Sequence, residues 1–505
     1  MMQHWITLPI LWPLLTGVLL IFMARAGRDA KRAVSLVSAL VSLPIMILLV
    51  QQAMTDQIQV YALGNWVPPF GIVLVLDRLT ALLLLMTSIL AIMALLYGIR
   101  GDDKPGRNFH PLFHFQLVGI YGAFLTGDLF NLFVFFEILL ISSYGLLMHG
   151  AGPARTRATL HYVILNLTGS ALFLIGVGTL YGMLGTLNMA DLAVQMRNIP
   201  VEDAPIVQAA GLILLVVFGL KAAMLPLYFW LPNAYSSASP SVASLFAIMT
   251  KVGVYAVLRV HGLLYGPEAG VVAGSIMAWV WPIAALTIVF GAFGVIGART
   301  LKRAVSYLVI VSVGTLLIVA ATEDQQTLVG GIYYLIHSTF ITAALFLIAD
   351  IISEQRGATQ DYLAPAQPLA QPRLLAVIFF FSAASVAGLP PLSGFIGKAL
   401  ILTGSAGASF AVVMWFVMLG AGLVGLISMS RAGSTIFWRV SESTAIGRKA
   451  DRMKLAVALM LLALSPLLTI FAEPVIQYAQ ATATQLLNTT GYIEAVLGPS
   501  ALGVQ

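Results

Sequence analysis

Two proline-interrupted hydrophobic stretches decide the fold of this chain: Lys221-Ala-Ala-Met-Leu-Pro226-Leu-Tyr-Phe-Trp-Leu-Pro232 and Gly388-Leu-Pro390-Pro391-Leu-Ser-Gly-Phe-Ile-Gly-Lys398. Proline removes a backbone hydrogen bond and breaks or kinks a helix. Paired broken helices in the two halves of a membrane protein are typical of inverted repeats with an ion site near the bilayer midplane. We therefore predict two inverted repeats of about five helices, each containing a broken helix. A plain kink without function is the alternative at each break.

The composition requires that these stretches lie in lipid. Of the 505 residues, 60% are hydrophobic and 9% are charged, whereas soluble domains have about 25% charged residues. Roughly 20 apolar residues cross the hydrocarbon core, and backbone groups in lipid must bond internally, so each long apolar run is expected to be a helix. We therefore predict an all-α polytopic membrane protein with about fourteen transmembrane helices. The expected helices cover residues 5–24, 33–52, 73–98, 110–127, 129–149, 158–182, 206–230, 240–262, 271–297, 303–321, 327–350, 373–391, 408–430 and 454–472.

The distribution of basic residues predicts the orientation of the chain. Short cytoplasmic loops of membrane proteins are enriched in Lys and Arg. Alternate loops hold most of the 26 Lys and Arg residues, whereas the opposite loops hold only Arg197 and Arg259. We expect the basic loops to face the cytoplasm of a bacterial inner membrane, with both termini on the periplasmic side. The basic residues are Arg25, Arg28, Lys31, Arg32, Arg100, Lys104, Arg107, Arg155, Arg157, Arg299, Lys302, Arg303, Arg356, Arg373, Arg431, Arg439, Arg448, Lys449, Arg452 and Lys454.

These helices divide the sequence into four expected parts. Residues 1–109 hold the first three helices, 110–262 the first repeat, 263–438 the second repeat, and 439–505 the last helix with a C-terminal tail. The first helix has no Lys or Arg before it and is long enough to span, so we expect it to be retained rather than cleaved as a signal peptide. No segment between the helices is long enough for a separate soluble domain.

The absence of cysteine limits the chemistry of the chain. Disulfides, thiolate metal sites and cysteine-ligated iron–sulfur clusters are excluded. We expect no cofactor and no metal in this chain. If the protein works with redox partners, another subunit must hold their centres.

Five ionisable residues fall inside predicted helices, where charge is costly. A charged side chain at a helix centre costs about 2.5–3.5 kcal/mol on insertion scales, and such groups are functional by default. Glu137 is expected to lie roughly 12 Å deep at 1.5 Å per residue. We expect all five to form a row along the membrane plane that translocates protons or ions. They are Glu137, Lys221, Lys251, His337 and Lys398.

These residue types suit a switchable proton relay, since carboxylates, amines and imidazoles all gain and lose protons. A Glu137–Lys221 pair favours both charged forms, and drawing Lys221 toward Lys251 releases Glu137 to take up a proton. Each residue also has a structural reading. The Glu–Lys pair is then a fixed staple, His337 a hydrogen-bonded packing residue, and Lys398 a cap for carbonyls freed by the helix break.

Other polar residues favour structural roles. We interpret Asp77 and Asp128 as caps at helix starts. Asn166 and Ser170 are expected to be contacts between helices, which polar residues often supply in membranes. His114 lies close to a helix end and is expected at the membrane interface.

The candidate residues lie in motifs that carry a family resemblance. The motifs are Gly127-Asp128-Leu129-Phe130-Asn131, Phe136-Glu137, Gly219-Leu220-Lys221 with Pro226 and Trp230-Leu231-Pro232, Lys251-Val252-Gly253-Val254-Tyr255, Lys302-Arg303, His337 with Leu345-Phe346, and Gly388-Leu389-Pro390-Pro391 through to Lys398. With them, residues from about 70 to 440 resemble the antiporter-like membrane subunits of respiratory complex I, membrane-bound hydrogenases and Mrp-type cation/proton antiporters. Within that family the chain is most similar to the D subunits of Mrp antiporters.

The resemblance carries expectations about fold, site and partners. It implies two inverted five-helix bundles, each with a broken helix. It implies that Glu137 and Lys221 form the pair of the first half and that Lys251 is the central link. His337 and Lys398 would continue the path in the second half. It also implies a hetero-oligomer with other antiporter subunits, which together exchange Na⁺, Li⁺ or K⁺ for H⁺ using the proton-motive force.

Two positions depart from the pattern of the relatives. Many relatives carry a lysine within the turn after the histidine, whereas residues 338–342 have none. Complex I relatives commonly carry a histidine where this chain has Tyr228. Two other functions stay open: a proton-pumping membrane subunit of a complex I-like or hydrogenase redox complex, and a non-transporting scaffold subunit. The neighbouring genes would discriminate between antiporter and redox partners.

Overall fold

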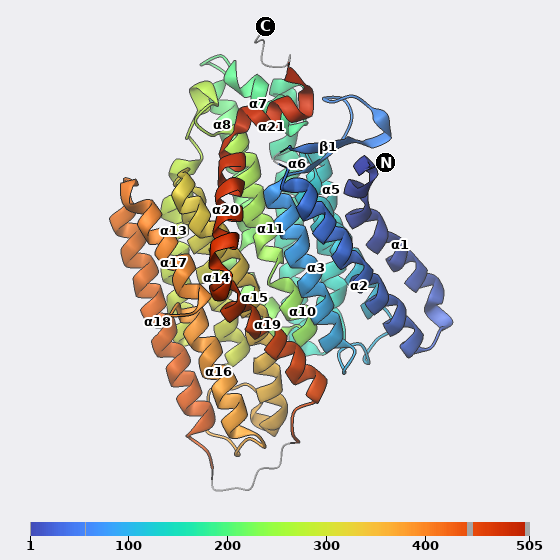
Figure 1. Ribbon diagram of the computed structural model, residues 1–505, viewed down its shortest axis with the longest axis vertical. Helices are drawn as coiled ribbons and strands as arrows, with labels where there is room; N and C mark the ends of the chain where they lie inside the picture. The colour runs from blue at the N-terminus through green and yellow to red at the C-terminus, as the bar shows by residue number, and fades with distance from the viewer. Residues whose placement is uncertain (1, 56, 442–447, 500–505) are drawn as a thin grey trace.

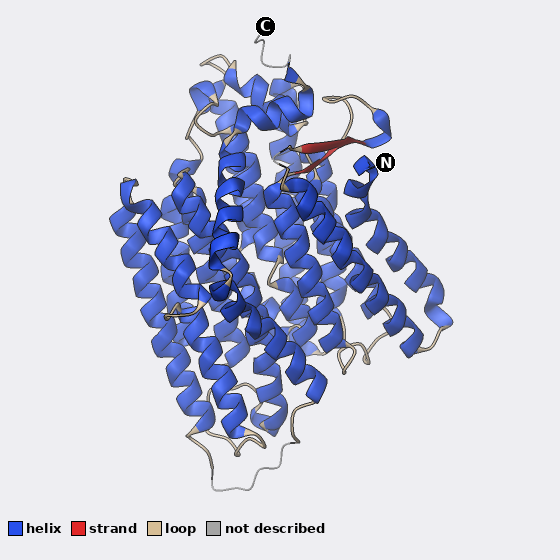
Figure 2. Cartoon of the chain, viewed as in Figure 1, coloured by secondary structure: helices blue, strands red, loops and turns tan. Residues whose placement is uncertain are grey.

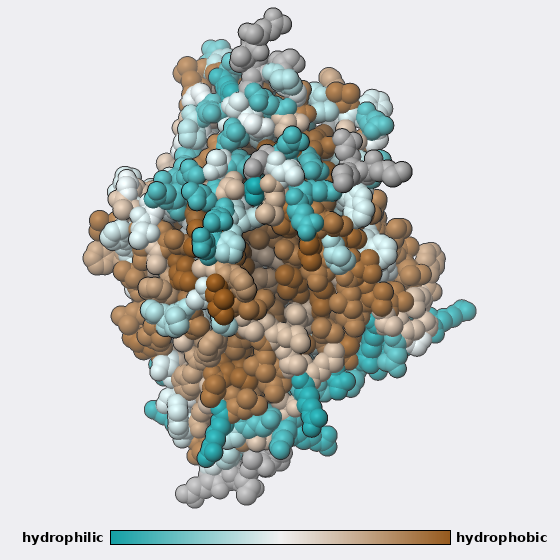
Figure 3. Space-filling view, in the orientation of Figure 1, coloured by the Kyte–Doolittle hydropathy of each residue, from teal (hydrophilic) through white to brown (hydrophobic). Residues whose placement is uncertain are grey.

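The computed structural model describes residues 2–55, 57–441 and 448–499, and nearly all of them are helical (Figure 1, Figure 2). Twelve helical stretches of these residues are long and apolar enough to cross a membrane. A hydrophobic band lies between two more hydrophilic ends (Figure 3). The predicted all-α polytopic fold is confirmed. The twelve stretches are His4–Arg25, Arg28–Ala53, Arg78–Gly98, Leu129–Met148, Pro153–Leu184, Ala204–Ser237, Pro240–Leu264, Gly270–Gly297, Leu301–Ala320, Gln325–Gln355, Ala411–Phe437 and Arg452–Ile470.

Two further predicted spans coincide with shorter helices. Span 110–127 corresponds to α4 (Phe109–Leu125), and span 373–391 begins with α16 (Pro372–Ala387). Each of the expected transmembrane segments therefore has a helical counterpart. The other long helices are α1 (Leu8–Phe22), α2 (Arg28–Ala53), α3 (Arg78–Gly98), α5 (Leu129–Met148), α6 (Pro153–Leu184), α8 (Ala204–Ala222), α13 (Met277–Gly297), α14 (Leu301–Ala320), α15 (Gln325–Gln355), α18 (Ala411–Phe437) and α19 (Arg452–Ile470).

A β-hairpin replaces the start of one expected helix. The sequence predicts a helix from residue 73, but β2 (Val73–Leu76) is a strand that pairs antiparallel with β1 (Gln59–Ala62). Valines in β2 are β-branched and suit a strand. The helix α3 begins after Asp77, whose Oδ1 accepts a hydrogen bond from the Thr80 backbone N–H at 2.8 Å. This bond confirms the predicted role of Asp77 as a helix cap.

Apart from the pieces that follow the two helix breaks, three α-helices of the described residues lie outside the predicted spans. They are α7 (Met189–Arg197), α20 (Ala472–Leu487) and α21 (Thr489–Leu497). In Figure 1, α7 and α21 lie together at one end of the molecule, and they contact each other. The sequence predicts only a tail after the last span. The structure instead places α20 against α15 and α3.

Both predicted helix breaks are present. Helix α8 ends at Ala223, which is left-handed with φ of 62°, and the chain resumes as η4 (Leu227–Phe229) and α9 (Trp230–Ser237). Helix α16 ends at Gly388 with φ of 87°, and the chain resumes as α17 (Ser393–Gly404). Pro226, Pro390 and Pro391 lie in the non-helical links. Proline cannot continue a helix, because it has no backbone N–H to donate.

Ten of the membrane-crossing segments fall into two sets of five. In each set, the fourth segment is the one that is broken. The first set is α4, α5, α6, α8–α9 and the segment made of α10 (Pro240–Phe246), α11 (Met249–Ala256), the π-helix η5 (Val257–His261) and α12 (Gly262–Leu264). The second set is α13, α14, α15, α16–α17 and α18. Each set crosses the bundle an odd number of times, so the second set starts from the opposite face. This order agrees with the predicted inverted repeats.

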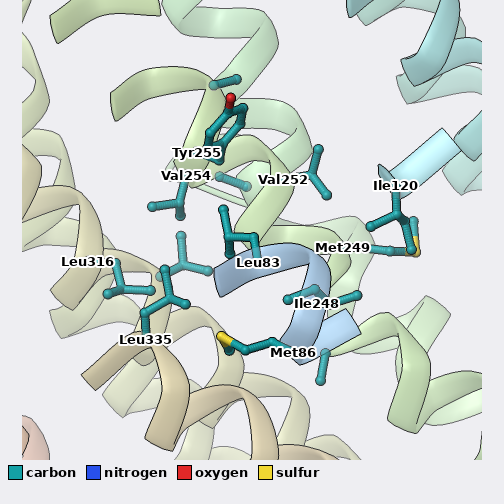
Figure 4. Close-up of a cluster of buried hydrophobic side chains, with 14 of the residues drawn as sticks. Leu83, Met86, Ile120, Ile248, Met249, Val252, Val254, Tyr255, Leu316 and Leu335 are labelled. Atoms are coloured by element: carbon teal, nitrogen blue, oxygen red, sulfur yellow. The ribbon is translucent and has the colours of Figure 1, made fainter. Parts of the chain in front are cut away.

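Helices α11 and α15 form the centre of the molecule. The apolar windows of their spans are each 94% buried. Figure 4 shows the side chains that surround α11, which include Leu83 and Met86 from α3, Ile120 from α4, Leu316 from α14 and Leu335 from α15. A charged residue on α11 is therefore shielded from lipid on all sides.

Two residues are more deeply buried among the helices than the sequence indicates. Arg259 was counted among the loop residues, but it lies in η5, within the expected span 240–262, and is 6% exposed, because an ion pair with Asp77 satisfies its charge. His114 was expected at the interface, but it is buried between α4 and α2, where its Nε2 lies 3.0 Å from the Ser35 hydroxyl.

Candidate functional site

Glu137 lies on α5, half-buried, and faces α6. The Ser170 hydroxyl donates a hydrogen bond to Glu137 Oε1. The same hydroxyl lies 3.0 Å from the backbone oxygen of Asn166, one turn earlier on α6. Residues four apart share one face of a helix, so Asn166 and Ser170 present their side chains to the same neighbours.

Lys221 lies in the last turn of α8, immediately before the helix break. Its ammonium donates a hydrogen bond to Asn166 Oδ1 at 3.1 Å and lies 5.9 Å from the centre of the Phe136 ring. No ion pair within 4.0 Å joins Glu137 to Lys221 among the described residues. One turn of α6 connects them instead, through Ser170 and Asn166. The sequence predicts Glu137 and Lys221 as site residues. It assigns Asn166 and Ser170, which connect them, to helix packing.

Lys251 lies on α11 and is fully buried. Its ammonium donates to the Ser312 hydroxyl on α14 at 3.0 Å, and that hydroxyl lies 2.8 Å from the backbone oxygen of Val309. A Cβ on Gly253 would lie 2.4 Å from the Ala222 backbone nitrogen. The backbones of α11 and α8 therefore touch at the end of α8, and this contact brings Lys251 beside the helix that carries Lys221.

His337 and Lys398 meet the two ends of the second helix break. His337 lies on α15, and its Nδ1 is 2.8 Å from the hydroxyl of Ser393, the first residue of α17. Lys398 donates to the backbone oxygen of Ala387, the last residue of α16, at 2.7 Å. Lys398 thus caps a carbonyl freed by the break, as its structural reading expected. The break supplies both polar partners.

A chain of hydroxyls extends from His337 to the last transmembrane helix. Ser393 Oγ lies 2.8 Å from Ser465 Oγ on α19, and Ser465 Oγ lies 2.7 Å from Ser385 Oγ on α16. All three serines are buried. Sequence reasoning missed them, because an isolated serine in an apolar helix carries no pattern. The position of Ser393 just after Pro390 and Pro391 is the one signal in the sequence that could have pointed to it.

An ionic cluster lies where α14, α15 and α19 approach the basic loops. Asp350 on α15 accepts from Lys302 at 3.2 Å and from Lys454 at 3.5 Å. It also accepts a hydrogen bond from the Tyr97 hydroxyl at 2.9 Å. Lys454 contacts Glu354 at 2.5 Å. Helix α15 therefore carries both His337, in its middle, and the carboxylate of this cluster near its end.

A second ionic pair lies on the other side of Lys251. Arg259 forms a buried ion pair with Asp77 and lies over the rings of Tyr255 and Tyr492, at 5.6 and 5.1 Å from their centres. Lys251, Tyr255 and Arg259 follow each other at four-residue intervals along α11 and η5 and so share one helix face. Polar groups therefore continue from the middle of the bundle to the end covered by α21.

The described part of the chain holds no group of three or more His, Asp or Glu residues placed to bind a metal ion. The five candidate residues are instead spaced along the bundle, and each is bonded to a hydroxyl, an amide or a carbonyl. Such chains of exchangeable groups suit proton transfer.

Comparison with known proteins gives the family of the chain. A family model described as NADH:quinone oxidoreductase/Mrp antiporter, transmembrane, matches residues 126–424. The D subunit of a probable K(+)/H(+) antiporter of Rhizobium meliloti (strain 1021) is 40% identical, and the alignment covers 100% of this chain and 99% of that protein. The D subunit of the Na(+)/H(+) antiporter of Bacillus subtilis (strain 168) is 38% identical over 98% of this chain and 100% of that protein. A chain in the structure of the Mrp complex from Dietzia sp. DQ12-45-1b superposes with a TM-score of 0.89 at 28% identity, covering 99% and 100% of the two chains.

Fold, polar residues and relatives together define a membrane subunit of the proton-antiporter class. The chain belongs to the NADH:quinone oxidoreductase/Mrp antiporter transmembrane family. The two full-length relatives named above are both D subunits of cation/proton antiporters. The resemblance carried by the sequence motifs is therefore confirmed.

Proposed function

We propose that this chain is the D-type subunit of a multisubunit monovalent cation/proton antiporter, and that it conducts the protons. The observation that supports this most is the set of buried ionisable groups in both halves, each bonded to a polar group on a neighbouring helix or at a helix break. Buried charge of this kind is expensive, so a path for ions is its usual reason. As a transporter subunit, the chain is not an enzyme and needs no cofactor.

In the first half, Glu137 is the proton acceptor and Lys221 the switch. With Lys221 bonded to Asn166, its positive charge stabilises ionised Glu137 through Ser170. A proton arriving on Lys251 repels the Lys221 ammonium, because like charges interact strongly where water is excluded. A charged Lys221 favours loss of the proton from Glu137, because it stabilises the carboxylate. A neutral Lys221 favours uptake of a proton by Glu137, because that stabilisation is absent.

In the second half, His337 and Lys398 continue the path around the broken helix. Ser393, Ser465 and Ser385 supply hydroxyls that both donate and accept protons. The ionic cluster at Asp350 lies at the basic end, where we place the cytoplasm. Both termini then lie on the periplasmic side of a bacterial inner membrane. The repeats at 110–262 and 263–438 are the two proton-conducting units in this proposal.

Partner subunits complete the transporter. Relatives of this chain are subunits by name, and we propose that this chain likewise works in a hetero-oligomer with other antiporter subunits. The hetero-oligomer exchanges Na⁺ or a related cation for H⁺.

Cation-dependent dissipation of a pH gradient tests this function. The complete set of subunits is expressed in a host without its own antiporters, and everted vesicles receive Na⁺, K⁺ or Li⁺ after respiration has built the gradient. Dissipation that depends on the cation and persists after respiration is inhibited supports antiport. A complex that responds to no cation, but pumps protons only while an electron donor is supplied, would assign the chain to a redox complex instead.

A further inference from the structure

A cavity of about 630 Å³ opens between α13 and α18 at the basic end of the bundle. Loop residues 362–365 close one side of it. Among the described residues, its charged lining consists of three arginines, and Ser428 and Thr435 add two hydroxyls. The arginines are Arg299, Arg431 and Arg439. The proton path described above uses none of these residues.

The three guanidinium groups have no counter-ion in the part of the chain that the structure describes. Among the described residues that line the cavity, none is acidic. None of the three side chains forms a hydrogen bond or an ion pair with another described residue. The carboxylate of Asp361, in the adjoining loop, accepts instead from the Lys302 backbone N–H at 2.9 Å. The cavity is therefore strongly positive.

The wall of the cavity is held in place from behind. The buried Arg356 guanidinium donates to the backbone oxygens of Gln360, Tyr362 and Ala364, at 3.0, 2.6 and 2.5 Å. The backbone N–H of Leu363 also donates to the Arg299 oxygen at 2.9 Å. Because these hydrogen bonds fix the loop, the wall that it forms is already in place before any ligand binds.

The cavity continues into an apolar groove that faces the membrane. Ile296 on α13 and Ile427 on α18 line the cavity and are 48% and 58% exposed. One turn further along each helix, Phe293 and Leu423 are exposed as well. Helices α13 and α18 pack side by side, so their apolar side chains form two parallel rows that lead away from the arginines.

We propose that this cavity binds the headgroup of an anionic phospholipid, whose acyl chains lie along α13 and α18. Positive pockets between transmembrane helices at the cytoplasmic face are suited to anionic headgroups. Arginine binds phosphate through two parallel hydrogen bonds, which fixes its orientation. The apolar rows favour a lipid over a free phosphate ion, because a free ion leaves them without a partner.

Lipid binding to the purified whole complex tests this proposal. Native mass spectrometry follows the binding of palmitoyl-oleoyl phosphatidylglycerol, with the zwitterionic phosphatidylcholine of the same chains as comparison. The test variant is Arg299→Gln/Arg431→Gln/Arg439→Gln. The matched control, Arg157→Gln/Arg373→Gln/Lys449→Gln, removes three exposed positive charges that do not line the cavity. A third variant with all three cavity arginines changed to lysine keeps the charge and guards against a folding defect.

The lysine variant is expected to bind phosphatidylglycerol, and the control to bind it like the wild type. Each arginine strengthens binding of an anionic lipid about fivefold, so the glutamine variant is expected to lose affinity on the order of 100-fold. Binding of phosphatidylcholine stays unchanged and weak. Equal phosphatidylglycerol binding by the glutamine variant and the control would overturn the proposal.

A second measurement distinguishes a lipid from a partner protein in the groove. The chain has no native cysteine, so Ser428→Cys gives it one site for a benzophenone crosslinker. Crosslinking to lipid in vesicles containing phosphatidylglycerol supports the proposal. Crosslinking to another subunit of the complex, with no lipid adduct, would assign the cavity to a subunit interface and overturn it.

Discussion

Asn166 and Ser170 link the two ionisable groups of the first half at the scale of single residues. The sequence predicts Glu137 and Lys221 because charge inside a membrane helix stands out, but it gives no reason to separate Asn166 from other helix-packing amides. Only the packing of α6 against α5 and α8 shows that the two side chains link carboxylate and ammonium. A polar residue becomes part of a site through its neighbours, which one sequence does not display.

Replacing Asn166 by alanine is expected to slow proton-coupled exchange. Lys221 loses its side-chain acceptor, and a hydrogen bond to a charged group contributes about 1.5–3 kcal/mol, so the rate falls about 10-fold or more. The rate of cation-induced ΔpH dissipation in everted vesicles measures this. Thr168→Ala is the matched control on the same helix, because Thr168 is exposed and its hydroxyl bonds only to the Ile164 backbone oxygen. Equal rates in the two variants would remove Asn166 from the path.

Asp102, in the loop between α3 and α4, gives a prediction about pH. Burial raises the pKa of Asp102 from 3.8 to about 6, although Ser241 donates two hydrogen bonds to it. The folded protein therefore binds this proton more tightly than the unfolded chain. The stabilising contribution is complete below the unfolded pKa and is lost as the pH rises through about 6.

Asp102→Asn is expected to remove this dependence. The pKa difference corresponds to about 3 kcal/mol, so the variant gains stability relative to the wild type between about pH 4 and pH 6 and keeps a constant advantage above that. Thermal unfolding of the assembled complex across this range measures the difference. Parallel curves for the two proteins at all pH values would contradict the assignment.

At the scale of helices, the prolines predicted both breaks correctly, because proline acts locally and its effect needs no knowledge of tertiary contacts. The β-hairpin at 59–76 was missed, since an apolar run before a helix reads as part of that helix. Helices α20 and α21 were missed because they do not stand out as apolar runs. They carry too few apolar residues to span, and their position depends on surfaces offered by α3, α7 and α15.

The contact between α11 and α8 gives a prediction at this scale. A Cβ on Gly253 would lie 2.4 Å from a backbone nitrogen of α8, which cannot move aside without moving the helix. Gly253→Ala is therefore expected to destabilise the subunit by about 1–3 kcal/mol despite the better helix propensity of alanine. Gly262→Ala is the control, because nothing lies within 4 Å of a Cβ there. A melting temperature for Gly253→Ala at or above that of the control would show that the helices do not touch.

At the scale of the whole molecule, ionisable residues that the sequence scatters over more than 250 positions lie on helices that pack around one centre. The all-α class and the family followed from hydropathy and motifs. The two ionic clusters did not, because the members of each cluster come from distant parts of the chain. The clusters contain Asp350 with Lys454 and Asp77 with Arg259. The proposed function requires that the polar groups of both repeats conduct protons together.

The most direct test of that claim is the exchange rate of the Glu137→Gln complex. Glutamine keeps an oxygen to accept the Ser170 hydrogen bond but cannot take up or release a proton, and Glu202→Gln, at an exposed position, controls for the loss of a carboxylate. Cation-dependent ΔpH dissipation is measured in everted vesicles with assembly verified by co-purification of the partner subunits. We predict that Glu137→Gln assembles but loses exchange, while Glu202→Gln exchanges like the wild type. Full exchange by an assembled Glu137→Gln complex would contradict this claim, and the proton path would have to lie outside this residue.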